Sequence, residues 1–164
     1  MVINVKIYLQ RDNSDMYSRF EAYDDRGELI YRVRGRVTPS GESIAVTDDR
    51  DETLCKIRRL GFSALSVFRI RAGSDSVGLN VAVAGGRATA RFRGISFRLR
   101  GDIMTGSYEI LDADNSLICA VSANIPKGCI LLTVDMPERE LLCIAAAVCI
   151  AGFAAQPKPA LQMT

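Results

Sequence analysis

The feature that most constrains this chain is an uncharged apolar run from Leu141 to Ala155, which reads LLCIAAAVCIAGFAA. A helix that is apolar on every side must be hidden in protein or in lipid. A membrane-spanning helix needs about 20 apolar residues, and this run is shorter and rich in alanine, which gives a weak drive for insertion. We therefore predict a helix that is buried inside the protein, and no transmembrane segment.

Signals at both ends of the run define this helix. Asp135 is a candidate N-cap, and Pro137 suits a first helical turn. Prolines also follow the run and interrupt the helical pattern. The sequence thus predicts a central helix over about 137–155 within a single domain of residues 1–156, followed by a flexible tail over 157–164.

Almost every segment before the run carries strand signals, either alternating polarity or a short apolar stretch bounded by turn residues. Twelve short strands are expected, over residues 2–10, 17–23, 28–33, 43–47, 53–59, 62–71, 77–84, 87–93, 95–100, 106–111, 117–123 and 129–134. Evenly spaced short strands favour an antiparallel meander that closes into a barrel or sandwich. A helix narrowed by Ala, Cys and Gly fits the lumen of a barrel. We therefore predict a mainly β fold, a closed antiparallel barrel of about twelve strands that encloses the C-terminal helix.

An internal echo agrees with this architecture. The segment RFEAYDDRGELIYRV (19–33) aligns without gaps with SYEILDADNSLICAV (107–121). Both read as strand–turn–strand units, and Gly27 stands opposite Asn115, two residue types that tolerate a left-handed backbone. The echo indicates two similar halves of one sheet system.

Composition narrows the function. The chain of 164 residues contains no His, which excludes His-ligated metals and catalytic arrangements that use a His base. Its five Cys residues show no CxxC spacing, so zinc clusters and thioredoxin-type chemistry lack their geometry. We expect reduced core thiols, no cofactor and no enzymatic activity. The N-terminus carries no signal-peptide pattern, so we expect a cytoplasmic protein.

An arginine-rich stretch is the most suggestive candidate site. Arg91, Arg93, Arg98 and Arg100 fall in a short window, and within 95–100 the arginines alternate with apolar residues. On a barrel wall this alternation points guanidinium groups outward, where they could hold the phosphate of a lipid headgroup or of a nucleic acid. The alternative is an ordinary barrel exterior, on which these arginines pair with Glu or Asp of adjacent strands.

Three segments in succession carry a family resemblance: DDRGELIYRV (24–33), FRLRGDIMTGSYEILDADNSLICAV (97–121) and the terminal apolar helix. Their order and spacing resemble the tubby C-terminal-like superfamily, specifically its LURP-one-related and phospholipid scramblase branches, across nearly the whole chain. The resemblance implies a twelve-stranded barrel wrapped around its C-terminal helix. Because tubby domains bind phosphoinositides, it also implies a module that binds anionic lipid headgroups or membrane surfaces.

The scramblase branch also directs attention to one metal site. Its counterpart of DADN (112–115) opens a segment associated with calcium, which makes Asp112 and Asp114 weak candidate ligands. Ala123 stands where a closing carboxylate would be expected. We therefore expect a β-turn whose Asp and Asn side chains cap their own backbone, with no bound metal.

Three classes of function remain. The first is a non-enzymatic barrel that binds anionic lipid headgroups and lies peripherally at a membrane. The second is a protein-interaction or structural module without a small ligand. The third, nucleic-acid binding, is disfavoured by a net charge of only +2 and by the absence of Trp.

Overall fold

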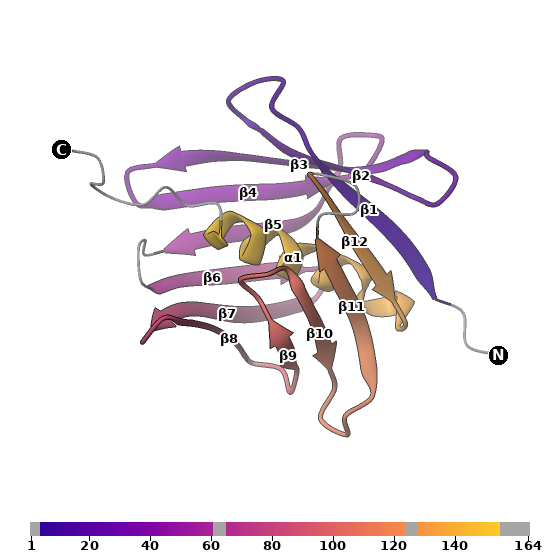
Figure 1. Ribbon diagram of the computed structural model, residues 1–164. Coiled ribbons are helices and arrows are strands. Elements are labelled where there is room, and N and C mark those ends of the chain that lie inside the picture. The colour runs from indigo at the N-terminus through magenta and orange to yellow at the C-terminus, as the bar shows by residue number, and fades with distance from the viewer. Residues whose placement is uncertain (1–3, 61–64, 124–127, 155–164) are drawn as a thin grey trace.

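The computed structural model describes residues 4–60, 65–123 and 128–154. They form twelve β-strands, one turn of 3-10 helix and one α-helix (Figure 1). The strands are β1 (Val5–Arg11), β2 (Ser18–Tyr23), β3 (Leu29–Thr38), β4 (Gly41–Thr47), β5 (Thr53–Leu60), β6 (Leu65–Ala72), β7 (Asp75–Ala84), β8 (Arg87–Arg93), β9 (Arg98–Asp102), β10 (Ser107–Leu111), β11 (Leu117–Ala123) and β12 (Cys129–Val134). The 3-10 turn η1 (Pro137–Arg139) leads directly into α1 (Glu140–Ala154).

All twelve strands belong to one antiparallel sheet in the order β8-β7-β6-β5-β4-β3-β2-β1-β12-β11-β10-β9. Strand β1 pairs with β12 and so joins the two halves of the chain. The sheet curls into a nearly closed barrel, and its edge strands β8 and β9 contact each other (Figure 1). Phe92 of β8 and Phe97 just before β9 pack edge to face, with ring centroids 5.7 Å apart. The predicted antiparallel barrel of about twelve strands is confirmed.

Helix α1 runs through the lumen of this barrel (Figure 1). Every residue from Leu142 to Ile150 is buried, and the strands surround them with inward Ile, Leu, Val and Phe side chains. The alanines Ala145, Ala146 and Ala147 are at most 1% exposed. Small side chains let the wall approach the helix axis closely, so the lumen holds a thin rod that is apolar on all sides. The enclosed C-terminal helix is thereby confirmed.

The start of the helical segment differs from the prediction. Met136, and not Asp135, is the N-cap of η1, and no side chain caps it. The backbone N–H of Asp135 donates to the carbonyl of Ile118, so Asp135 continues the hydrogen bonding of the wall. The Tyr31 hydroxyl of β3 holds the first turn of α1 instead, because it donates a hydrogen bond to the Glu140 carboxylate.

Within the described residues, no helix has the length and the apolarity needed to cross a membrane. The last residue of the predicted helix and the predicted tail over 157–164 lie outside the described residues. The boundaries of the domain stay a prediction.

Candidate functional site

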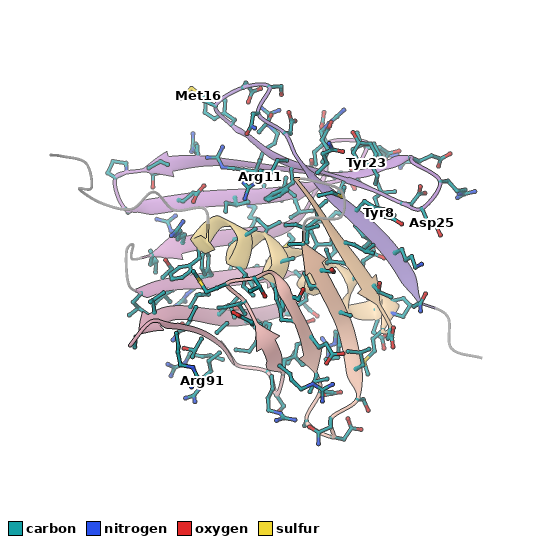
Figure 2. The ribbon with its side chains drawn as sticks, in the orientation of Figure 1. Tyr8, Arg11, Met16, Tyr23, Asp25 and Arg91 are labelled. Carbon is teal, nitrogen blue, oxygen red and sulfur yellow. The ribbon has the colours of Figure 1, made fainter. Side chains whose placement is uncertain are left out.

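Antiparallel pairing places the connections between strands alternately at the two ends of the barrel. The connection from β1 to β2 lies at one end, together with those that follow β3, β7 and β9, with the last residues of β5 and β11, and with the C-terminal end of α1. The connection from β2 to β3 lies at the other end, together with those that follow β4, β6, β8, β10 and β12. Figure 2 labels Met16 at the first end and Asp25 at the second.

Exposed hydrophobic side chains gather at the first end. Among the described residues, the large hydrophobic side chains that are exposed are Met16, Tyr17, Val37, Leu60, Leu65, Val83 and Met104. All of them lie in or beside a connection at this end. Single exposed apolar residues are normal on a protein surface, whereas their concentration in one place marks an interaction site. We call this set of seven residues the apolar rim.

Carboxylates gather at the second end. It holds most of the nineteen Asp and Glu residues of the chain. We call the following set the acidic rim: Asp24, Asp25, Glu28, Asp48, Asp49, Asp51, Glu52, Asp75, Asp112, Asp114, Asp135, Glu138 and Glu140. The two ends of the barrel therefore differ sharply in chemistry.

One turn recurs three times at the acidic rim. It is built by DDRGE (24–28), DDRDE (48–52) and DADNS (112–116). In each copy the first Asp donates its backbone N–H to the carbonyl of the fifth residue and accepts from the N–H of the fourth. The fourth residue is left-handed, with φ of 80° at Gly27, 61° at Asp51 and 68° at Asn115. The internal echo of the sequence is thus a shared turn, and the copy at 48–52 is one that the sequence analysis missed.

In the third copy of the turn, Asp112 and Asp114, the two candidate metal ligands, accept hydrogen bonds from nearby backbone N–H groups. The Asp112 carboxylate accepts from the backbone N–H of Ala113 at 2.7 Å, and that of Asp114 accepts from the N–H of Ser116 at 3.0 Å. Hydrogen bonds from Ser116 lower the pKa of Asp114. Across the described residues, no group of three or more His, Cys, Asp or Glu could hold a metal ion. These carboxylates cap a turn, and the expectation that calcium does not bind here stays a prediction.

A field of exposed cations covers the outer wall between β3 and β8. We call it the basic face, and its members are Arg34, Arg36, Lys56, Arg58, Arg69, Arg71, Arg91 and Arg93. The strand register lines up Arg36, Arg58, Arg69 and Arg93 in one row across the sheet, with Ser43 and Gly78 between them. Each strand carries its two cations two residues apart, so both point outward.

The basic face contains like charges in direct opposition. Arg58 lies opposite Arg69, and Lys56 lies opposite Arg71, on the neighbouring strands β5 and β6. Like charges placed opposite each other destabilise a sheet. Of the eight cations, and within the described residues, Arg34 alone has a carboxylate oxygen within 4.0 Å, that of Asp15 at 3.6 Å. The rest of the basic face is available to an external anion.

The four arginines predicted from the sequence divide into two pairs. Arg91 and Arg93 lie on β8 and belong to the basic face. Arg98 and Arg100 lie on β9, where Arg98 donates a hydrogen bond to the side chain of Asn115. The Arg100 guanidinium bonds to the carboxylate of Glu109, its register partner on β10, with 2.9 Å between Nε and Oε1. For Arg100 the structure therefore shows the pairing with an adjacent strand that was the alternative interpretation.

A shallow hollow of about 410 Å³ connects the apolar rim to the basic face. Tyr17 lines it from the rim, and Arg34, Arg36 and Ser43 line it from the wall. A hydrogen bond of 2.8 Å from the Gly35 N–H to the Tyr17 carbonyl holds the rim loop against β3. Apolar and cationic groups thus meet in one concave surface.

The cysteines take no part in this surface. All five are buried and free. Burial raises the pKa of the Cys55 thiol to about 11, so this thiol remains protonated and unreactive at neutral pH.

Comparison with known proteins adds the family. The model of the LURP-one-related family matches residues 5–151. The chain belongs to the LURP-one-related family, which is part of the tubby C-terminal-like superfamily. The chain is 21% identical over 146 residues to "Uncharacterized protein YxjI" of Bacillus subtilis (strain 168). The aligned region covers 88% of this chain and 90% of that protein. An X-ray structure of a protein from Arabidopsis thaliana superposes with a TM-score of 0.57 at 11% identity over 88% of each chain, a likeness that shows the fold.

Proposed function

We propose that this protein is a non-enzymatic module that associates peripherally with anionic membrane surfaces through the apolar rim and the basic face. The observation that carries the proposal is the segregation of chemistry on the barrel. Exposed apolar groups lie at one end, most of the carboxylates lie at the far end, and the wall beside the apolar groups carries exposed cations, of which only Arg34 has a carboxylate partner among the described residues. A bilayer surface offers the matching order of an apolar interior and anionic headgroups.

The two surfaces meet on β5 and β6. Leu60 and Arg58 point outward two residues apart on β5, and Leu65 stands near Arg69 on the outer side of β6. Each basic residue close to an anionic surface contributes about 1 kcal/mol, and apolar side chains add the free energy of removing their area from water. Several weak contributions of this kind give reversible association. The acidic rim, on the far end of the barrel, escapes the negative potential, which decays over a Debye length of about 8 Å at physiological ionic strength.

The experiment is flotation of the full chain with liposomes of neutral lipid alone, and with liposomes that also contain anionic phospholipid or phosphoinositide, at low and at physiological salt. We expect binding to the anionic liposomes that weakens as salt rises. The double variant Arg58→Gln with Arg69→Gln should lose most of this binding and gain slightly in stability, because it removes a pair of opposed like charges.

The variant Arg98→Gln with Arg100→Gln removes the same charge and is the matched control. We expect it to bind nearly as the wild type does, since its arginines already have partners on β10 and in the turn that follows β10. Loss in this control, with retention in the first variant, would move the contact to β9, which carries two of the four arginines predicted from the sequence. Wild-type protein that ignores anionic liposomes at low salt would overturn the proposal and favour a protein-interaction module. Salt-dependent binding to RNA or DNA with no binding to liposomes would favour a nucleic-acid partner.

A further inference from the structure

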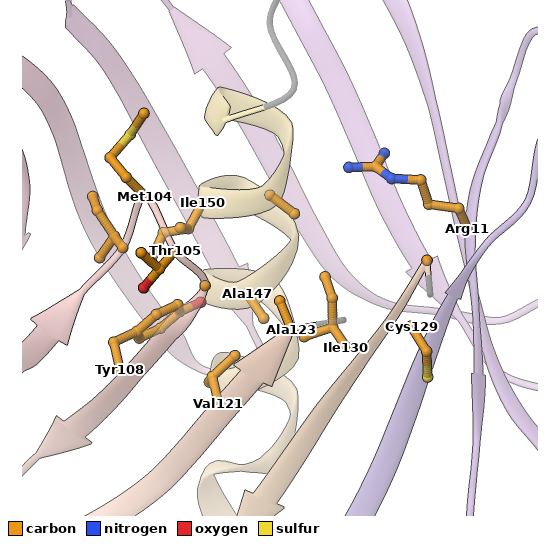
Figure 3. Close-up of a pocket in the computed structure, with 14 residues that line it drawn as sticks. Arg11, Met104, Thr105, Tyr108, Val121, Ala123, Cys129, Ile130, Ala147 and Ile150 are labelled. Atoms are coloured by element: carbon orange, nitrogen blue, oxygen red, sulfur yellow. The ribbon is translucent and has the colours of Figure 1, made fainter. Parts of the chain in front are cut away.

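A cavity of about 240 Å³ lies between the last turns of α1 and the barrel wall, next to the apolar rim. Figure 3 shows it between the helix and strands β10, β11 and β12. Its walls are mainly apolar, and they include Val121, Ile130, Ala147 and Ile150. Ala147 and Ile150 are at most 3% exposed, so the cavity lies beside a helix that the wall otherwise encloses.

Several of the residues that line the cavity are small. Ala123 of β11 and Ala151 of α1 line it, together with Gly106 of the β9–β10 connection. A Cβ on Gly106 would lie 2.4 Å from the Cβ of Ala123, so no larger residue can take this place without moving the wall. The backbone of Gly106 has a φ of +84°, which also favours glycine. Glycine at position 106 therefore keeps the β9–β10 connection in close contact with β11 where both border the cavity.

The hydroxyl of Thr105, which lines the cavity, donates to the Asp102 carbonyl at 3.1 Å, and two other polar side chains lie in the lining. Arg11, at the end of β1, extends toward the last turns of α1 (Figure 3) and is the one charged residue of the lining among the described residues. Its guanidinium stacks on the ring of Phe20, with Cζ 5.1 Å from the ring centroid, and no described carboxylate lies within 4.0 Å of it. The stacking holds the cation in place while its edge remains open to an anion.

Tyr108 supplies the second polar group. It is only 5% exposed, and its hydroxyl is directed toward α1 beside Ala123 and Ala147 (Figure 3). Burial raises its pKa well above the usual value, so the hydroxyl stays protonated and can donate. The lining thus combines an apolar body, an internal hydroxyl and a single cation at one side.

We propose that this cavity binds a small amphipathic acid, of the class of medium-chain fatty acids, with its chain between α1 and the wall and its acid group at Arg11. The volume lies below the range of about 300–1,000 Å³ that is typical for drug-sized ligands, so the ligand must be small. A lone cation beside an apolar space selects one negative charge on an apolar body. The inference goes beyond membrane association, because it concerns a space behind the wall and involves none of the basic face.

The test is calorimetric titration of the full chain with decanoate, below the concentration at which decanoate forms micelles. We expect saturable binding of one molecule per chain and no comparable binding of decylamine, which has the opposite charge. Decyl phosphate, with a chain of equal length, distinguishes a carboxylate ligand from a lipid phosphate. The variant Arg11→Gln should weaken decanoate binding about tenfold or more, because it removes a charge-assisted hydrogen bond. Arg36→Gln, which removes an exposed arginine outside the cavity, is the matched control and should leave decanoate binding unchanged.

A second variant fills the space directly. Ala151→Leu places a larger side chain in the void and should abolish binding while the thermal midpoint stays equal or rises. Nuclear Overhauser contacts between the decanoate chain and the Tyr108 ring provide a readout that does not depend on any variant. No saturable binding to the wild type, or undiminished binding to a folded Ala151→Leu protein, would overturn the proposal. The Arg36→Gln control separates the two proposals. If this variant binds liposomes more weakly but binds decanoate as the wild type does, the result concerns membrane association and leaves the cavity proposal intact.

Discussion

The two rims of the barrel are made of connections between the same kind of strands, yet folding explains only one of them. At the acidic rim the first Asp of each five-residue turn accepts hydrogen bonds from its own backbone, and Glu140 begins α1 next to the positive end of the helix. These carboxylates serve the fold. At the apolar rim, Val37 is 72% exposed and Met16 is 75% exposed, so neither side chain fills the core.

The acidic rim therefore has a structural explanation that the apolar rim lacks. Each connection of a meander forms independently of the others, so folding does not require that exposed apolar side chains gather at one end of the barrel. Exposed apolar groups in fact favour aggregation. Hydrogen bonding within the fold accounts for the first Asp of each turn at the acidic rim, whereas the proposed membrane contact would account for the apolar rim.

A large side chain placed in the lumen should have the largest effect on stability. It tests whether α1 fills the barrel, and the comparison of the two rims depends on that arrangement. If α1 lies inside the barrel, Ala146→Trp must displace the wall, and we expect destabilisation of at least about 1–3 kcal/mol. Urea denaturation measures it. An Ala146→Trp protein as stable as the wild type would place the apolar run elsewhere, and the rims would no longer be the two ends of a filled barrel.

Substitutions at the two rims should then differ in their effect on stability. Asp48→Ala removes the acceptor for the backbone N–H groups of Arg50 and Glu52, each bonded at 2.9 Å, and should cost about 1–2 kcal/mol. Leu65→Ser removes an exposed side chain and should change the free energy of unfolding by less than about 0.5 kcal/mol. Both are measured by urea denaturation under the same conditions. A larger loss for Leu65→Ser would show that the apolar rim has a structural role.

Much of the fold followed from the sequence because its two signals are local. Strand alternation and turn residues located all twelve strands in order, and the small-residue run located the helix. The errors arose where pairing overrides local pattern. Strand β3 continues to Thr38 through a charged stretch, because Gly35 takes an inward position close to Ile44 of β4. Strand β9 begins at Arg98, because the residues from Gly94 to Phe97 cross between the two edges of the sheet.

The surfaces were harder to predict, because they depend on which strands are neighbours. Proximity in the chain grouped Arg98 with Arg93, although only Arg93 belongs to the basic face and Arg98 has a hydrogen-bond partner of its own. The register that opposes Arg58 to Arg69 has no local signature. The rims, in contrast, could have been found: in an antiparallel meander every second connection lies at the same end, and the repeated letters DDRGE and DDRDE stand in connections of the same parity.

Lowering the pH should have the smallest effect on stability, and this effect should come from the carboxylates of the recurring turn. Hydrogen bonds lower the pKa of Asp24, chiefly through the backbone N–H of Glu28, and lower that of Asp114 through Ser116, both from an unfolded value of 3.8. A carboxyl whose pKa is lower in the folded state stabilises the fold fully above its unfolded pKa. That contribution is lost as pH falls from about 3.8 through the folded pKa. The thermal midpoint should therefore decline below about pH 4, and Asp24→Asn should decline less steeply than the wild type. Asp25→Asn is the control, because it changes the adjacent acid, which lies outside the hydrogen bonds of the described turn. Its thermal midpoint should fall with pH as steeply as that of the wild type. Equal slopes in all three proteins would show that the turn does not depend on the charge of its first Asp.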